Sequence, residues 1–268
     1  MSVVLEARNV SKDFDGNRLF ENISFTCKKK SVLFVQGSNG SGKSTLLKVL
    51  AGIYEPTDGK VIRNTNKIGY VPEHFPEGIR FKVKEYLSLT ASFHAAEEGK
   101  EQLIANYVDL FDLSPFLSMP LEACSKGTKQ KVGIIQALLM RPEILLLDEP
   151  LTGLDLKSQQ TLISVLQEIR GQMPILFTAH DEGLVSQMAT DILHISSGKM
   201  TSYQPHFKKE KWIRVQFIDE KDLGFIPPNR IQFDGNTALI TVDQEKSDEL
   251  LLKLLQTNCS ILEVKEKA

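Results

Sequence analysis

The chain has 268 residues, of which 41% are hydrophobic and 25% are charged, with 32 Lys and Arg against 34 Asp and Glu. These proportions are typical of a globular protein and exclude a disordered chain, a collagen-like repeat and a disulfide scaffold. The near balance of charge gives no electrostatic reason to expect nucleic acid as a partner. The length allows one large domain, or a main domain with a small appendage.

No apolar stretch approaches the roughly 20 residues that span a bilayer, and the first residues lack the basic start and long apolar core of a secretory signal. The three cysteines, Cys27, Cys124 and Cys259, lie far apart. Their spacing indicates neither a disulfide framework nor a metal-binding pair. We therefore expect a cytoplasmic protein that acts on a membrane only through a partner chain.

The first third of the chain is predicted to be rich in β-strands. Short apolar runs separated by turn residues predict strands at 3–7, 19–25, 32–35, 60–62 and 67–71. The run 45–51 has helical spacing and stops at Gly52, a residue typical of helix ends.

Helical spacing then dominates from about 82 to 140, with a last helix from Lys126 or Thr128 to Leu139. After Pro142, strands at 144–147, 175–177 and 192–195 alternate with helices at 158–170 and 184–188. This alternation indicates parallel βα units.

A polar segment at 201–211, which contains Pro205, is interpreted as a domain boundary. Beyond it, strands are predicted at 212–217, 231–233, 238–242 and 260–264, with a helix at 246–255. We expect a main domain at 1–203 and a small α+β domain at 204–268.

The clearest motif begins directly after the predicted strand 32–35. It fits the pattern G-x-x-x-x-G-K-[ST] and leads into a helix, which is the context that a phosphate-binding loop requires. Glycines let the backbone N–H groups wrap around phosphates, and the helix N-terminus adds its dipole. Lys43 is expected to bring positive charge to the β- and γ-phosphates, and Ser44 to ligate Mg²⁺. The predicted nucleotide-binding residues are Gly37, Ser38, Asn39, Gly40, Ser41, Gly42, Lys43, Ser44 and Thr45.

A second motif, Ile144-Leu-Leu-Leu-Asp-Glu-Pro150, places two carboxylates at the end of a strand apolar enough to be buried on both faces. Asp148 is suited to hold Mg²⁺ through water, and Glu149 to polarise a water that attacks the γ-phosphate. Alone, the pair would equally well form a strand-end turn or a helix cap. A phosphate loop in the same chain favours the catalytic interpretation.

Together these motifs resemble the ATP-binding subunit of ATP-binding-cassette (ABC) transporters. Leu151-Thr-Gly-Leu-Asp155 is similar to the D-loop of that family, and Cys124-Ser-Lys-Gly-Thr-Lys-Gln130 to its signature sequence, usually written LSGGQ. Phe177-Thr-Ala-His180 resembles the switch-histidine motif. The resemblance covers about residues 1–203. It implies an α/β P-loop NTPase cassette with an N-terminal antiparallel β subdomain and a helical insert at about 75–140.

The resemblance also implies roles for single residues. Phe14 is expected to stack on adenine, His180 to sense the γ-phosphate beside Glu149, and Glu73 to ligate Mg²⁺ together with Ser44 and Asp148. Ser125 and Gly127 are expected to contact the ATP of the opposite subunit. Lys126 would either add positive charge there or face solvent. The catalytic residues would be Glu149, His180 and Lys43, with Asp155 in the D-loop.

Two departures from the common family pattern bear on the direction of transport. Glu73 stands where most relatives have glutamine, and Lys126 replaces the first glycine of the signature. Both features resemble the exporter-type (drug and antibiotic) branch, whose membrane subunits are separate chains. They favour export over nutrient import.

The implied function is therefore a Mg²⁺-dependent ATPase that closes into a head-to-tail dimer, with a second copy or a homologous subunit, around two ATP molecules. It would drive a separate integral-membrane permease from the inner face of the cell membrane. Two alternatives stay open: a non-transport ABC ATPase, and an ATP-switched dimer with little turnover. The small domain at 204–268 would support dimerisation, regulate the activity of the main domain, or only cap the fold.

Overall fold

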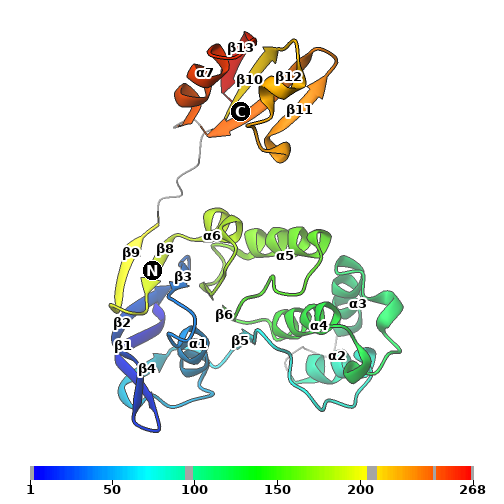
Figure 1. Cartoon of the computed structure of the whole chain (residues 1–268). Coiled ribbons are helices and arrows are strands. Elements are labelled where there is room, and N and C mark those ends of the chain that lie inside the picture. Colours follow the sequence, from blue (N-terminus) through cyan, green and yellow to red (C-terminus); the bar gives the residue numbers. More distant parts are fainter. Residues whose placement is uncertain (1–2, 94–98, 204–209, 244–245, 267–268) are drawn as a thin grey trace. The chain divides into compact units, whose positions relative to one another are not determined.

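The computed structural model describes residues 3–93, 99–203, 210–243 and 246–266. Within it the chain forms two compact units, Met1–Pro205 and His206–Ala268, which are drawn in Figure 1. Most of the polar segment interpreted as a boundary lies outside the described residues.

An antiparallel sheet begins the first unit, with strand order β2-β1-β4. Its strands are β1 (Val3–Phe14), β2 (Asn17–Lys28) and β4 (Asp58–Arg63). Asp15 and Gly16 both have positive φ, which is the two-residue turn that suits a tight hairpin. The strands β1 and β2 extend well beyond the predicted apolar runs because polar residues occupy their exposed face and register shifts interrupt the alternation.

A six-stranded sheet with the order β5-β6-β7-β3-β8-β9 forms the centre of this unit. Neighbouring strands are parallel except for β9, which returns antiparallel to β8. The predicted parallel βα arrangement is thus confirmed. The strands are β3 (Val32–Gln36), β5 (Ile68–Val71), β6 (Ile144–Leu147), β7 (Ile175–Phe177), β8 (Asp191–His194) and β9 (Lys199–Ser202).

Helices cover both faces of the sheet, so its strands are apolar throughout. In β3, Leu33 and Val35 pack toward α1 and the antiparallel sheet, whereas Val32 and Phe34 pack toward the remaining helices. Helices α2, α3 and α4 gather beyond the β5 edge, where α4 contacts β5 (Figure 1). The helices are α1 (Lys43–Ala51), α2 (Val83–Ser92), α3 (Lys100–Leu110), α4 (Lys126–Leu139), α5 (Leu156–Ile169) and α6 (Glu182–Met188), with short 3₁₀ turns η1 (Ser114–Phe116) and η2 (Leu121–Ala123).

The second unit is an antiparallel sheet of order β11-β12-β10-β13 with one helix packed against it. Ile213, Val215 and Ile240 are fully buried in its own apolar core. Its elements are β10 (Glu210–Gln216), η3 (Glu220–Leu223), η4 (Pro228–Arg230), β11 (Ile231–Asp234), β12 (Thr237–Asp243), α7 (Ser247–Leu255) and β13 (Ser260–Glu266).

Candidate nucleotide site

The two main motifs meet at the carboxyl ends of β3, β6 and β7, where ligands bind in parallel sheets. A cavity of about 460 Å³ opens there. Most of the residues expected to bind nucleotide, metal or water line it, and the full lining is Leu19, Asn39, Gly40, Gly42, Lys43, Ser44, Thr45, Glu73, Asp148, Glu149 and His180. The structure therefore brings together residues that lie more than 130 positions apart in the sequence.

The loop after β3 turns into α1 at Gly42, which has a φ of 91° and acts as the helix N-cap. Only glycine adopts this conformation without strain, so the sequence places it where the chain must turn. The Lys43 ammonium donates hydrogen bonds to the carbonyl oxygens of Gly37 and Ser38, at 3.0 and 3.1 Å. The lysine is thereby folded back over the loop, and its charge lies beside the N-terminus of α1, a position suited to bind phosphate.

Asp148 is almost fully buried and is held by a residue that the sequence did not reveal, Thr178. The Thr178 hydroxyl donates to Asp148 Oδ1 and accepts from the Glu149 backbone N–H, both at 2.8 Å. Thr178 is fully buried just after β7. One side chain therefore fixes both the first carboxylate and the backbone of the second.

Glu149 follows in the left-handed region, with a φ of 47°, which is costly for a residue with a long side chain. The His180 backbone N–H donates to Glu149 Oε2 at 3.0 Å, and His180 Nε2 lies 3.5 Å from Oε1. Burial raises the pKa of Glu149, and the neighbouring His180 opposes that rise. The carboxylate is thus constrained in position and less acidic than an exposed glutamate.

The donor set fits Mg²⁺ bound together with a nucleotide. Ser44, Glu73 and Asp148 line the same cavity, and hydroxyl and carboxylate oxygens are the ligands that this ion prefers. Among the described residues no group of three His, Cys, Asp or Glu side chains is placed to hold a metal ion. Mg²⁺ typically takes only one or two protein carboxylates beside substrate phosphates, so the arrangement suits a metal that arrives with ATP.

The signature residues lie away from the cavity of their own chain. Ser125 is the N-cap of α4, and its hydroxyl accepts from the Thr128 N–H at 3.1 Å. A Cβ at Gly127 would collide with the carbonyl oxygen of Gly153 in the D-loop. The aliphatic stem of Lys126 also packs against Gly153. Gln130 in α4 also donates to the Pro150 carbonyl at 3.3 Å. Signature and D-loop are therefore packed together within one chain.

Asp155 at the end of the D-loop caps α5. It accepts hydrogen bonds from the Ser158 backbone N–H, at 2.9 Å, and from the Ser158 hydroxyl. These bonds lower the pKa of Asp155. Its second partner is Lys131 in α4, at 3.5 Å, so this carboxylate links two elements rather than lining the cavity.

Phe14, expected to stack on adenine, lies at the end of β1 with 41% of its surface exposed. It does not line the cavity. The Tyr54 ring packs edge to face on the Phe14 ring, with 5.7 Å between the two ring centres. The Lys12 ammonium lies 4.9 Å from the centre of the Phe14 ring. Tyr54 was not foreseen because it follows α1, forty residues away in the sequence.

Comparison with known proteins identifies the family. Residues 20–152 match the family described as ABC transporter. The zinc import ATP-binding protein ZnuC of Pasteurella multocida (strain Pm70) is 33% identical over 243 residues, which cover 89% of this chain and 86% of that protein. The protein of the same name from Rickettsia bellii (strain RML369-C) is 36% identical over 184 residues, covering 66% and 76%. The chain belongs to the ABC transporter family, as an ATP-binding subunit.

Solved structures agree with this assignment. One described as the ATP binding subunit of an ABC transporter has a TM-score of 0.69 at 25% identity, covering 74% of this chain and 90% of its own. A dimeric cassette in a post-hydrolysis state, bound to ADP and Pi, has a TM-score of 0.67 at 22% identity, covering 75% and 99%, and shows the fold alone. The predicted P-loop cassette fold is confirmed.

As a family member, the chain is the ATP-hydrolysing motor subunit of an ABC transporter, and it uses ATP with Mg²⁺. ABC cassettes dimerise and work with separate permease subunits. None of the described helices is long and apolar enough to cross a bilayer.

The expected direction of transport requires a correction. The matched relatives are named for import, so assignment to the exporter-type branch is not supported. The prediction rested on Glu73 and Lys126, which lie beside the nucleotide cavity and the D-loop respectively. Those positions belong to the predicted nucleotide and signature regions, and neither of them is assigned to a permease surface that could report the direction in which cargo moves.

Proposed function

We propose that this chain binds Mg²⁺–ATP in a head-to-tail dimer, formed with a second copy or a homologous subunit, and drives a separate permease that imports its cargo. The observation that carries the ATPase part is the cavity where Ser44, Glu73, Asp148, Glu149 and His180 converge. We assign this activity to residues 1–203, and treat 204–268 as a separate α+β domain.

In this proposal each side chain around the cavity has a distinct role. Lys43 neutralises phosphate charge, while Ser44, Asp148 and Glu73 hold Mg²⁺. When bound, Mg²⁺ would supply positive charge that stabilises the negative charge developing on the phosphate oxygens in the transition state. Glu149 orients the attacking water and accepts its proton, which suits a carboxylate with a raised pKa. The His180 backbone N–H holds Glu149 by donating to its carboxylate, and the exposed His180 ring would contact the γ-phosphate.

Dimerisation is supported by where the signature residues lie. Ser125, Lys126 and Gly127 form the N-terminus of α4, a 14-residue helix whose dipole favours an anion. None of the three lines the cavity of its own chain. A nucleotide held by a second subunit would supply the missing anion, and the adjacent Asp155 would lie at the same junction.

Import, with zinc as its cargo, is supported by the names of the matched relatives. The permease would hold the chain at the inner, cytoplasmic face of the cell membrane. The test is uptake of radioactive zinc by cells that lack the gene, compared with cells complemented by the wild-type chain or by Lys43→Ala. Restored uptake only with the wild type supports the proposal. Unchanged zinc uptake in all three strains would remove zinc as the cargo.

The dimer is tested separately with purified protein. Glu149→Gln should reduce ATP turnover by about 10²- to 10⁴-fold, the usual contribution of a general base. Since closure would then not be followed by hydrolysis, light scattering with ATP should show a dimer. Glu122→Gln, which changes an exposed glutamate in η2, is the matched control and should behave as wild type. A Glu149→Gln chain that stays monomeric with ATP would contradict the dimer.

A further inference from the structure

The second unit contains a cavity of about 400 Å³ between the loop before η4, the strand β12 and the helix α7. It exists because β11 pairs with β12 only as far as Ile231 opposite Ile240, whereas β12 continues to Asp243. The chain before Ile231 turns through η4 instead of extending as a strand. The resulting space has the volume of a small-molecule site.

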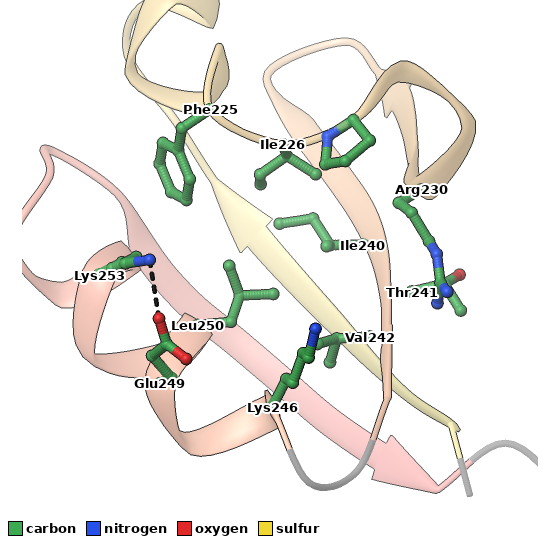
Figure 2. A pocket seen from close by; sticks show the side chains of 11 residues that line it. Phe225, Ile226, Arg230, Ile240, Thr241, Val242, Lys246, Glu249, Leu250 and Lys253 are labelled. Carbon is green, nitrogen blue, oxygen red and sulfur yellow. Dashed lines mark hydrogen bonds and ion pairs between the residues drawn. The ribbon is translucent and has the colours of Figure 1, made fainter. Parts of the chain in front are cut away.

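The floor of this cavity is apolar. Ile226, Ile240 and Val242 are buried members of the core of the unit, and Leu250 of α7 packs against them. Figure 2 shows Leu250 and Ile240 pointing toward the centre from α7 and β12, with Phe225 beside them. Phe225 is 47% exposed, so a ligand with an apolar body would remove costly apolar surface from water.

The rim of the cavity is cationic. Lys246, the N-cap of α7, and Lys253, in the last turn of α7, line the cavity together with Arg230 (Figure 2). Glu249 is the one carboxylate in the lining, and it bonds to Lys253 at 2.9 Å. That bond lowers the pKa of Glu249. Both side chains of the pair are therefore ionised, and their opposite charges largely cancel. Among the described residues, no carboxylate lies within ion-pair distance of Lys246.

We propose that this cavity binds a small amphipathic carboxylate. Its apolar chain would lie on Ile226, Ile240 and Leu250, and its carboxylate would lie at Lys246. Because Glu249 is paired with Lys253, the positive charge of Lys246 beside the apolar floor selects against cationic and neutral analogues of the same shape. The site shares no residue with the nucleotide cavity, so it is independent of the function proposed above.

Calorimetric titration of the full chain with sodium butanoate, hexanoate and octanoate tests the apolar floor. Each added pair of methylene groups should raise the affinity by about 15-fold until the cavity is filled. Heptylamine, which has the same seven-carbon apolar chain and the opposite charge, should bind at least about 3-fold more weakly than octanoate. Octanoate binding no tighter than butanoate, or heptylamine binding as tightly as octanoate, would overturn the proposal.

The rim is tested with a substitution at Lys246, the exposed N-cap of α7. Lys246→Glu removes one attractive charge and adds a repulsive one, and should weaken octanoate about 5- to 30-fold. Lys221→Glu reverses an exposed lysine in η3, outside this cavity, and should bind octanoate as the wild type does. Both variants should keep the wild-type circular dichroism spectrum and the wild-type melting transition of the second unit, which has its own apolar core, and this shows that the unit is folded. Equal octanoate affinity in the two variants, or binding of the chain to phosphatidylglycerol vesicles but not to octanoate, would refute the site.

Discussion

Thr178→Val removes the hydroxyl that joins the two carboxylates while keeping a side chain of similar shape. In the wild type this hydroxyl donates to Asp148 and accepts from the Glu149 backbone, with both bonds at 2.8 Å in a fully buried place. The valine leaves a buried N–H without its acceptor and a buried carboxylate oxygen without its donor. Each unsatisfied group costs roughly 1–3 kcal/mol, so we expect a loss of about 3 kcal/mol in the free energy of unfolding.

That loss corresponds to a fall of roughly 6–12 °C in the transition temperature of the first unit, measured by scanning calorimetry. Turnover, measured by phosphate release, should fall on the order of 10²-fold, because Glu149 loses the bond that fixes its strained backbone. Thr178→Ser keeps the hydroxyl and loses only a methyl group, worth about 1 kcal/mol. If the valine and serine variants match in transition temperature and turnover, the reasoning about Thr178 is wrong.

Three further predictions concern single substitutions. Gly127→Ala should lower turnover with little change in ATP affinity, because its Cβ displaces the D-loop carbonyl of Gly153; unchanged phosphate release would contradict this. Phe14→Ala should raise the KM for ATP about 10-fold through lost stacking, while Phe14→Tyr should not; equal KM values would exclude stacking. Burial raises the pKa of Glu149, so its protonated form stabilises the fold at acid pH, and this contribution is lost as pH rises through the raised pKa. The Glu149→Gln variant should therefore have a higher melting temperature than the wild type at pH 7.5 and the same melting temperature at pH 4. A difference in melting temperature that does not change with pH would contradict the raised pKa of Glu149.

Much of the site is encoded in short segments of sequence, and these were predictable. A phosphate loop needs its strand and helix directly beside it, so Lys43 and Ser44 were placed by the motif alone. Asp148 and Glu149 follow a strand buried on both faces, and parallel strands end at one edge of the sheet. The start of α4 was predicted at Lys126 or Thr128, and the structure begins the helix at Lys126, where the Ser125 side chain serves as the N-cap.

The remainder depends on which strands are neighbours, and one sequence does not specify that. Thr178 meets Asp148 because β6 and β7 pair in parallel, with Leu147 opposite Phe177. A threonine thirty residues away carries no local signal of this contact. The same holds for Tyr54 beside Phe14. The short turns η3 and η4 were also not foreseen, because three or four residues are too few to show a helical period.

The packing of Gly127 on the Gly153 carbonyl has a genetic consequence. In the proposed dimer, the start of α4 in one subunit contacts one nucleotide and Glu149 of the same subunit contacts the other. Only three residues separate Glu149 from Gly153 in the chain. A single altered subunit would then impair both nucleotides in a mixed pair. Alleles that change this junction should consequently be dominant over the wild-type copy, whereas alleles that abolish folding should be recessive.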